Sequence, residues 1–135
     1  MKILLAEDHD NLREIIDDYL VVHGYVVESF DNGEDAYYSF LTESYDLVLL
    51  DVMMPKMDGF TLCKKIREKE EIPILFITAK VQEVDQLKGY ELGCDDYIIK
   101  PFSLPVLLAK CNAIMNRKHY QFLERGVLKL NTREK

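Results

Sequence analysis

Short apolar runs that end at polar residues divide the first 100 residues into strands. The clearest run is Leu47 to Leu50, which stops at Asp51. Four residues are too few for a free-standing helix, and an apolar run without alternation is typical of a strand buried on both faces. Pro55 and Asp58-Gly59 then indicate a loop and a helix start. Similar runs predict further strands at residues 2–6, 25–29, 74–77 and 97–99.

Helical spacing of apolar residues marks the segments between these strands. The first such segment begins at Asp10 and closes at Gly24, a C-cap residue type. A second helical segment follows the turn at residues 31–33. Three more cover residues 60–69, 81–92 and 103–117. Strand and helix alternate five times, so the sequence predicts an α/β fold, a parallel sheet with helices on both faces.

The last 18 positions differ in pattern from the rest of the chain. Residues 118–135 begin polar, and residues 126–131 alternate like an edge strand with no helix after them. We therefore predict a main domain at residues 1–117, followed at residues 118–135 by a linker and the truncated start of a further unit that this chain does not contain.

Composition and charge narrow the class of protein. The 135 residues are 48% hydrophobic, enough for one domain with a sizeable core. A net charge of -7 argues against a nucleic-acid or anionic-membrane surface on this domain. The three cysteines form no C-x-x-C pair, and the N-terminal apolar run is too short for a signal or a membrane span. We expect a soluble cytoplasmic protein.

Polar side chains stand where the predicted strands end. Glu7 and Asp8 follow the first strand, Asp51 the third, Thr78 the fourth and Lys100 the fifth. Alone, each has a structural explanation, because such residues cap helices, line acidic loops or face solvent. The carboxyl ends of parallel strands share one edge, however, so these groups should converge there.

Gathered carboxylates repel one another unless a cation joins them. An all-oxygen set without histidine or cysteine favours a hard ion, and Mg²⁺ fits best. We expect Asp8 and Asp51 to be direct ligands and the backbone carbonyl of Met53 to supply another oxygen. Glu7 would act through water or support Asp8.

A site of this kind suits phosphoryl transfer, where catalysis is mostly positioning and charge neutralisation. Asp51 is the expected nucleophile, since it follows the central buried strand. Lys100 would hold one phosphoryl oxygen, and the Thr78 hydroxyl with the Ala79 amide another.

Several short motifs follow one another along residues 1–117: Asp8, the run from Leu49 to Pro55 with Asp58-Gly59, Thr78-Ala79, and Gly93 to Tyr97 followed by Lys100-Pro101-Phe102. In these motifs the chain resembles the receiver domain of bacterial two-component response regulators. The resemblance implies a flavodoxin-like sheet of order 2-1-3-4-5, a cis peptide before Pro101, and phosphorylation of Asp51 by a sensor histidine kinase. It also implies self-catalysed transfer and dephosphorylation rather than turnover as an enzyme.

The resemblance also implies how a signal would leave the site. In this family the hydroxyl at the Thr78 position moves inward and the aromatic ring at the Tyr97 position fills the space, although Tyr97 could be an ordinary half-buried tyrosine. The face of helix four, strand five and helix five would form a homodimer, with charged candidates Lys88, Asp95, Asp96, Lys110 and Arg117. Val106 and Gln86 depart from the family's usual glutamate and basic residue, so we expect a weak dimer.

The tail is similar to the opening strand of a winged-helix output domain, so DNA would be bound only by that missing domain. Three alternatives remain. One is an interaction module of the same fold that is not phosphorylated, and another is a receiver without output. The third, a haloacid-dehalogenase-like phosphatase, would need a second aspartate two residues after Asp51, where Met53 stands.

Overall fold

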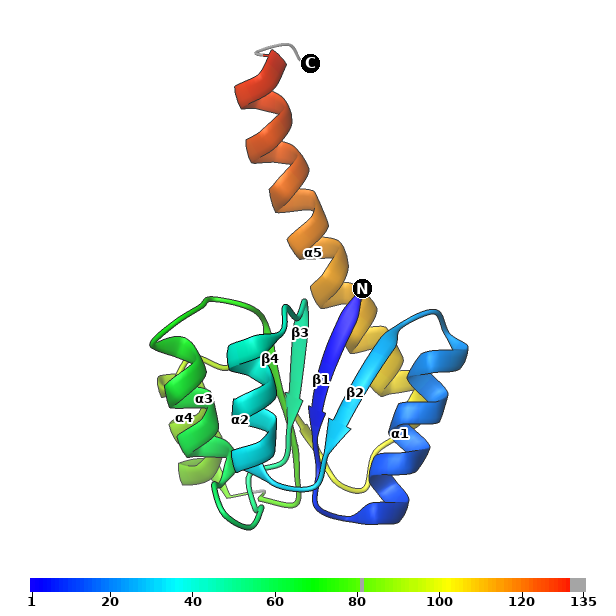
Figure 1. The fold of residues 1–135 in the computed structure, drawn as a ribbon, viewed down its shortest axis with the longest axis vertical. Helices are drawn as coiled ribbons and strands as arrows, with labels where there is room; N and C mark the ends of the chain where they lie inside the picture. Colours follow the sequence, from blue (N-terminus) through cyan, green and yellow to red (C-terminus); the bar gives the residue numbers. More distant parts are fainter. Residues whose placement is uncertain (81, 132–135) are drawn as a thin grey trace.

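The computed structural model describes residues 1–80 and 82–131, with residues 118–131 described by their backbone alone. Its five strands are β1 (Lys2–Ala6), β2 (Val26–Phe30), β3 (Leu47–Leu50), β4 (Ile74–Thr78) and β5 (Asp96–Ile99). All pair in parallel in the order β2-β1-β3-β4-β5, which confirms the predicted flavodoxin-like sheet. Because all pairs are parallel, every strand points its carboxyl end to the same edge, as the arrowheads of β1, β2 and β3 show in Figure 1.

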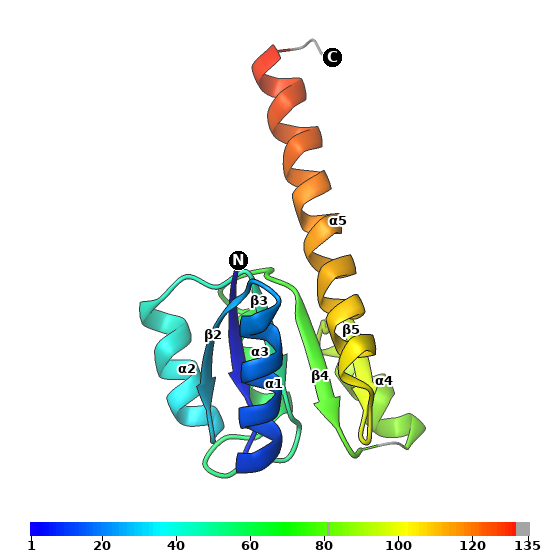
Figure 2. The ribbon, with the colours of Figure 1, turned by 90° about the vertical axis from the view of Figure 1, so that its right-hand side faces the viewer.

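The helices are α1 (Asp10–Val22), α2 (Gly33–Thr42), α3 (Gly59–Arg67), α4 (Glu83–Glu91) and α5 (Leu104–Asn131). Helices α1 and α5 cover one face of the sheet, and α2, α3 and α4 cover the other (Figure 2). The expected start of the fourth helix at residue 81 lies outside the described residues.

Two cores form because successive strand residues point to opposite faces. In β3, Val48 and Leu50 pack with α2 and α3, whereas Leu47 and Leu49 pack with α1 and α5. All four side chains are 0% exposed, as the uninterrupted apolar run predicted. β3 is therefore fixed on both sides, and the residue that follows it is held firmly.

Local signals set the ends of the helices. Asp58 Oδ1 accepts from the Thr61 amide at 2.8 Å and begins α3, while Asn32 caps α2 in the same way. Each such cap is worth about 1 kcal/mol. Gly24 has a φ of 97° just after α1, a conformation that glycine adopts without steric cost.

The predicted edge strand at residues 126–131 is wrong. Helix α5 continues to Asn131 and projects past the end of the sheet opposite the strands' carboxyl edge (Figure 1). A strand needs a neighbour to satisfy its backbone groups, whereas a helix bonds internally. Residues 121–125 are also mostly good helix formers. The helix therefore continues into residues 126–131, whose short pattern is compatible with either a strand or a helix. Residues 132–135 of the predicted second segment lie outside the described part of the chain.

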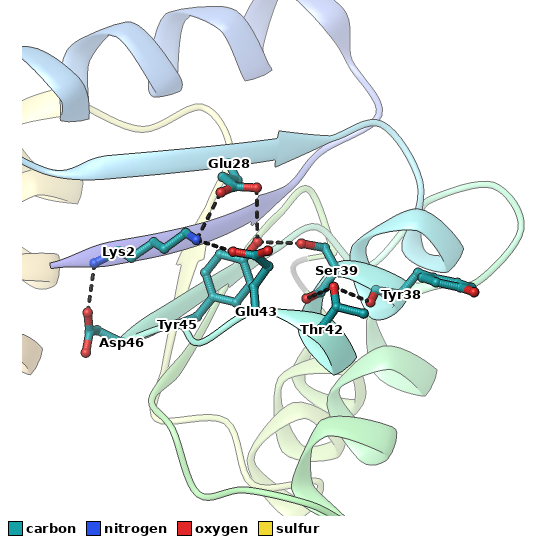
Figure 3. Close-up of polar contacts among 8 residues, drawn as sticks. All are labelled: Lys2, Glu28, Tyr38, Ser39, Thr42, Glu43, Tyr45 and Asp46. Atoms are coloured by element: carbon teal, nitrogen blue, oxygen red, sulfur yellow. Dashed lines mark hydrogen bonds and ion pairs between the residues drawn. The ribbon is translucent and has the colours of Figure 1, made fainter.

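A polar network holds the amino edge of the sheet, away from the strand ends that carry the candidate site. Lys2 Nζ lies 3.0 Å from Glu28 Oε2 and 2.6 Å from Glu43 Oε1, and its amide donates to Asp46 Oδ2 at 2.8 Å (Figure 3). The hydrogen bonds to Glu43 and Glu28 raise the pKa of Lys2. The network links β1, β2 and the segment before β3, although exposed ion pairs of this kind each stabilise a fold only slightly.

Within the described residues, no helix has both the length and the apolar character needed to cross a bilayer.

The three thiols should be unreactive in the folded protein. Cys63, Cys94 and Cys111 are buried and free, and burial raises their pKa to about 11, 12 and 12 respectively. Because the thiolate is the reactive form, we expect Ellman's reagent at pH 8 to label all three only after denaturation. Rapid labelling of the native chain would contradict this burial.

Candidate functional site

The strand ends bring the predicted polar residues to one edge of the sheet. Asp51 follows β3, and its amide donates to the carbonyl of Ala6, the last residue of β1, at 2.9 Å. Thr78 is the last residue of β4, and the Lys100 amide donates to its carbonyl at 2.9 Å. The peptide between Lys100 and Pro101 is cis, as the resemblance implied. Backbone pairing alone therefore aligns the termini of β1, β3, β4 and β5.

Three carboxylates meet at this edge. Oxygen atoms of Glu7, Asp8 and Asp51 all lie within 4.8 Å of one another. Glu7 is 0% and Asp51 4% exposed, whereas Asp8 faces solvent. The cluster is thus two buried acids beneath an accessible one.

Lys100 lies against both buried acids. Its Nζ is 2.8 Å from Asp51 Oδ2 and 2.8 Å from Glu7 Oε1. Burial raises the pKa of Glu7, opposed by the hydrogen bond from Lys100. Burial also acts to lower the pKa of Lys100, but the bonds to Asp51 and Glu7 outweigh it and the pKa is raised. With all groups ionised, three negative charges face one positive charge, so the cluster carries a surplus of two negative charges.

The helix-capping explanation for the strand-end residues fails. The cap of α1 is His9, that of α3 is Asp58 and that of α4 is Gln82, which makes no side-chain cap bond. Asp51 and Thr78 are buried and cap no described helix. Their burial at the edge of the sheet has no structural explanation in helix termination.

An open hollow of about 470 Å³ lies over the cluster. Its lining residues are Asp8, His9, Asp10, Asp51, Met53, Thr78, Ala79 and Lys100. Every predicted metal and phosphate-binding residue thus lines the hollow except Glu7. Glu7 lies beneath it, in the carboxylate cluster, and also accepts from the His9 amide at 3.0 Å. Met53 is exposed here, and its amide lies 3.3 Å from Asp51 Oδ1 as a donor.

The backbone of one residue, Lys80, joins the two predicted switch residues. The amide of Lys80 donates to Thr78 Oγ1 at 3.2 Å, and the Tyr97 hydroxyl donates to the Lys80 carbonyl at 2.7 Å. Tyr97 is 8% exposed, and its ring packs against Phe76 with centroids 5.9 Å apart. Tyr97 is therefore buried rather than half-buried. Sequence reasoning missed Lys80 because its backbone, not its side chain, makes both contacts.

The loop after β3 approaches the site so closely that it requires glycine. A Cβ atom at Gly59 would lie 2.1 Å from the carbonyl oxygen of Asp51, and the Gly59 amide donates to the Val52 carbonyl at 2.7 Å. Asp51 is thus held from below by β3 and from the side by the start of α3.

Most of the predicted dimer-face charges already have contacts within the protomer. Lys110 Nζ lies 2.8 Å from Asp96 Oδ2, and Lys88 Nζ lies 4.8 Å from the centre of the Phe60 ring. Asp95 Oδ2 accepts from the Ile74 amide at 2.8 Å and from Arg67 at 3.1 Å. Asp95 therefore anchors the start of β5. Arg117 is exposed, and Val106 is 48% exposed where the family usually has glutamate.

Comparison with known protein families agrees with this arrangement. The family described as the response regulator receiver domain matches residues 3–112. The chain is 47% identical over 118 residues to the transcriptional regulatory protein RprY of Bacteroides fragilis, covering 87% of this chain and 50% of RprY. It is 40% identical over 116 residues to the transcriptional regulatory protein ResD of Bacillus subtilis, covering 86% of this chain and 48% of ResD.

Solved structures share the fold across almost the same region. A two-component response regulator from Clostridium difficile superposes with a TM-score of 0.85 at 33% identity, covering 87% of this chain and 98% of the other. The beryllofluoride-activated N-terminal receiver domain of Klebsiella pneumoniae RstA gives a TM-score of 0.82 at 34% identity, covering 85% and 98%. The chain thus spans about half the length of the curated relatives it matches, and nearly all of these receiver structures.

Proposed function

Because this chain belongs to the response regulator receiver domain family of two-component systems, we propose that it is a switch whose Asp51 accepts a phosphoryl group in a Mg²⁺-dependent reaction. Members of the family are signalling proteins rather than ordinary enzymes, and they receive phosphoryl groups from histidine kinases. The observation that carries the proposal is the buried Asp51 carboxylate, 2.8 Å from Lys100 and clustered with Glu7 and Asp8.

The donor atoms of the cluster fit Mg²⁺. All are hard oxygens, and the surplus of two negative charges would repel a phosphoryl group unless a divalent cation offset it. Asp8, Asp51 and the backbone carbonyl of Met53 would hold the ion, which would supply charge neutralisation for the incoming phosphoryl oxygens. Glu7 is buried against Lys100 and the His9 amide, so its proposed role is to support the site from beneath.

In the transfer step, an Asp51 carboxylate oxygen attacks phosphorus, and the bond between phosphorus and the donor breaks with its electron pair leaving on the donor. Lys100 would move from Asp51 to a phosphoryl oxygen. Thr78 and Ala79 also line the hollow, and the Thr78 hydroxyl with the Ala79 amide would bind another phosphoryl oxygen. Later attack of water on phosphorus would return Asp51 to its free form and complete self-catalysed dephosphorylation.

The backbone contacts of Lys80 suggest how this chemistry reaches the surface. If the Thr78 hydroxyl turns to a phosphoryl oxygen, the bond that Oγ1 accepts from the Lys80 amide must weaken or rearrange. The Lys80 carbonyl, which binds the Tyr97 hydroxyl, belongs to the same residue. Phosphorylation would then act by stabilising one arrangement of Thr78, Lys80 and Tyr97 over another.

The output is proposed to be transcription regulation through a winged-helix DNA-binding domain beyond this chain. The proposal is supported by the relatives RprY and ResD, which are transcriptional regulatory proteins, each about twice the length matched here. Residues 1–117 would be the receiver, and residues 118–135 would lead toward the output domain.

Removing the metal should slow the phosphorylation of Asp51. With Mg²⁺ and radiolabelled acetyl phosphate, we expect label on the chain, and with excess EDTA we expect at least a tenfold lower rate, since the uncompensated carboxylates repel the donor. Filter-binding of protein-bound label measures both rates. Equal incorporation with and without EDTA would contradict the Mg²⁺ requirement.

Phosphorylation should strengthen a weak homodimer through α4, β5 and α5. Sedimentation equilibrium should show a larger dimer fraction when beryllofluoride and Mg²⁺ are added. Lys110→Ala alone should change it little, because the Lys110 contact in the structure is a half-exposed pair with Asp96 of the same protomer. An unchanged monomer fraction on addition of beryllofluoride would count against this dimer.

A further inference from the structure

His9 lies at the mouth of the phosphoacceptor hollow and has no role in the chemistry described so far. It follows Asp8 directly, lines the hollow with Asp51 and Lys100, and is exposed. It also occupies the N-cap position of α1, where Ser, Thr, Asp and Asn are the favoured residues. An imidazole at this position is thus a weaker cap than those residues, so its ring is of interest for what it can donate to the hollow.

The cap contact assigns the two ring nitrogens. Nδ1 of His9 accepts a hydrogen bond from the Leu12 amide at 3.4 Å, so Nδ1 bears no proton and Nε2–H is the ring's donor. The His9 amide is anchored to Glu7 Oε2 at 3.0 Å. The His9 backbone is therefore tied to the site and its ring to the first turn of α1, and one ring N–H group is free of the cap contact.

The charges around the mouth make such a donor useful. Asp8 and Asp10 are exposed carboxylates that line the hollow beside His9. Arg13 Nη2 lies 2.7 Å from Asp10 Oδ1 and offsets its charge, so Asp8 is the exposed carboxylate that repels an anionic phosphodonor. Among the residues that line the hollow, His9 and Lys100 alone carry side-chain N–H groups. Lys100 lies inside, against Asp51 and Glu7, where the transferred phosphoryl group would arrive. The part of the donor that is not transferred would lie nearer the rim.

We propose that His9 binds the part of a small acyl phosphate that is not transferred, donating Nε2–H to its acyl oxygen while the phosphoryl group meets Asp51. This inference rests on the proposed phosphoacceptor function and concerns its substrate class. In the step itself the bond between phosphorus and the bridging oxygen breaks, and the carboxylate leaves with the electron pair. His9 holds the donor in place and transfers no proton.

Two variants separate this role from helix capping. His9→Ser keeps a good N-cap and removes the N–H donor, whereas His9→Gln keeps an N–H donor of similar reach and caps less well. Initial rates of labelling by acetyl phosphate, measured over a range of concentrations, give the half-saturating concentration and the rate at saturation. We expect His9→Ser to raise the half-saturating concentration roughly threefold to tenfold, as for one lost hydrogen bond, and His9→Gln to recover much of it.

Beryllofluoride binding distinguishes the proposed role from a merely structural one. A structural role for His9 would weaken beryllofluoride binding as well, whereas the proposed role would not. Beryllofluoride mimics the phosphoryl group without the acyl part, so His9→Ser should bind beryllofluoride with Mg²⁺ as the unaltered chain does, measured by NMR titration. Circular dichroism melting should show that His9→Ser stays folded. The proposal is overturned if His9→Ser keeps the original half-saturating concentration, or if its beryllofluoride affinity falls by the same factor. Absence of labelling in the unaltered chain would overturn the phosphoacceptor function itself.

Discussion

Asp51→Asn is expected to reduce phosphoryl incorporation from acetyl phosphate by roughly two orders of magnitude or more. The amide oxygen of asparagine is a poor nucleophile, and the change also removes one metal ligand. The fold should survive, because the substitution nearly preserves shape and removes one negative charge from three that face Lys100 alone. Filter-binding of radiolabel measures the incorporation, and urea denaturation without Mg²⁺ should show no loss of stability.

Asp58→Asn is the matched control for that experiment. It makes the same chemical change seven positions along the chain, at an N-cap where asparagine is an equally good residue. Incorporation by Asp58→Asn should stay close to that of the unaltered chain. If Asp51→Asn and Asp58→Asn incorporate label equally, Asp51 is not the acceptor.

Gly59→Ala should destabilise the fold by about 3 kcal/mol, in the upper range for overpacking a rigid site. The added Cβ would lie 2.1 Å from the Asp51 carbonyl oxygen and 2.9 Å from the Val52 Cα atom. Both are backbone atoms next to a fully buried strand, so neither can move without shifting Asp51. The midpoint of urea unfolding measures the loss, and labelling by acetyl phosphate should fall with it.

Gly24→Ala separates steric clash from backbone strain. Gly24 has a φ of 97°, but a Cβ there meets nothing within 4 Å. Its cost should be about 1–2 kcal/mol, from the left-handed conformation alone. An unfolding midpoint for Gly59→Ala no lower than that for Gly24→Ala would contradict the close approach of the α3 start to Asp51.

The side chains that gather at the site could be predicted from the positions where the apolar strand segments end in the sequence. An apolar run that stops at Asp51, with others that stop at Glu7, Thr78 and Lys100, fixes which side chains reach the carboxyl edge once the strands are parallel. Parallel pairing itself follows from the alternation of strands and helices. Chain order therefore predicted the cluster without any knowledge of distances.

The missed features depend on contacts that carry no sequence signal of their own. The backbone of Lys80, not its side chain, makes the hydrogen bonds to Thr78 and Tyr97, so the residue type at position 80 does not predict them. Asp95 looked like a surface charge, yet it binds the Ile74 amide and Arg67 across the fold. The alternation of apolar and polar residues at 126–131 is too short to distinguish a strand from the end of a long helix. The structure has a helix there, because a helix satisfies its own backbone groups and a strand needs a neighbour.

Mass spectrometry of the acetyl phosphate-treated chain tests the central claim most directly. The chain is treated with Mg²⁺, digested under conditions that preserve acyl phosphates, and fragmented to locate the added phosphoryl group. We predict a single modified position, Asp51, with no adduct on Asp8 or in the EDTA-treated sample. An adduct on another residue, or none after prolonged treatment, would contradict the account.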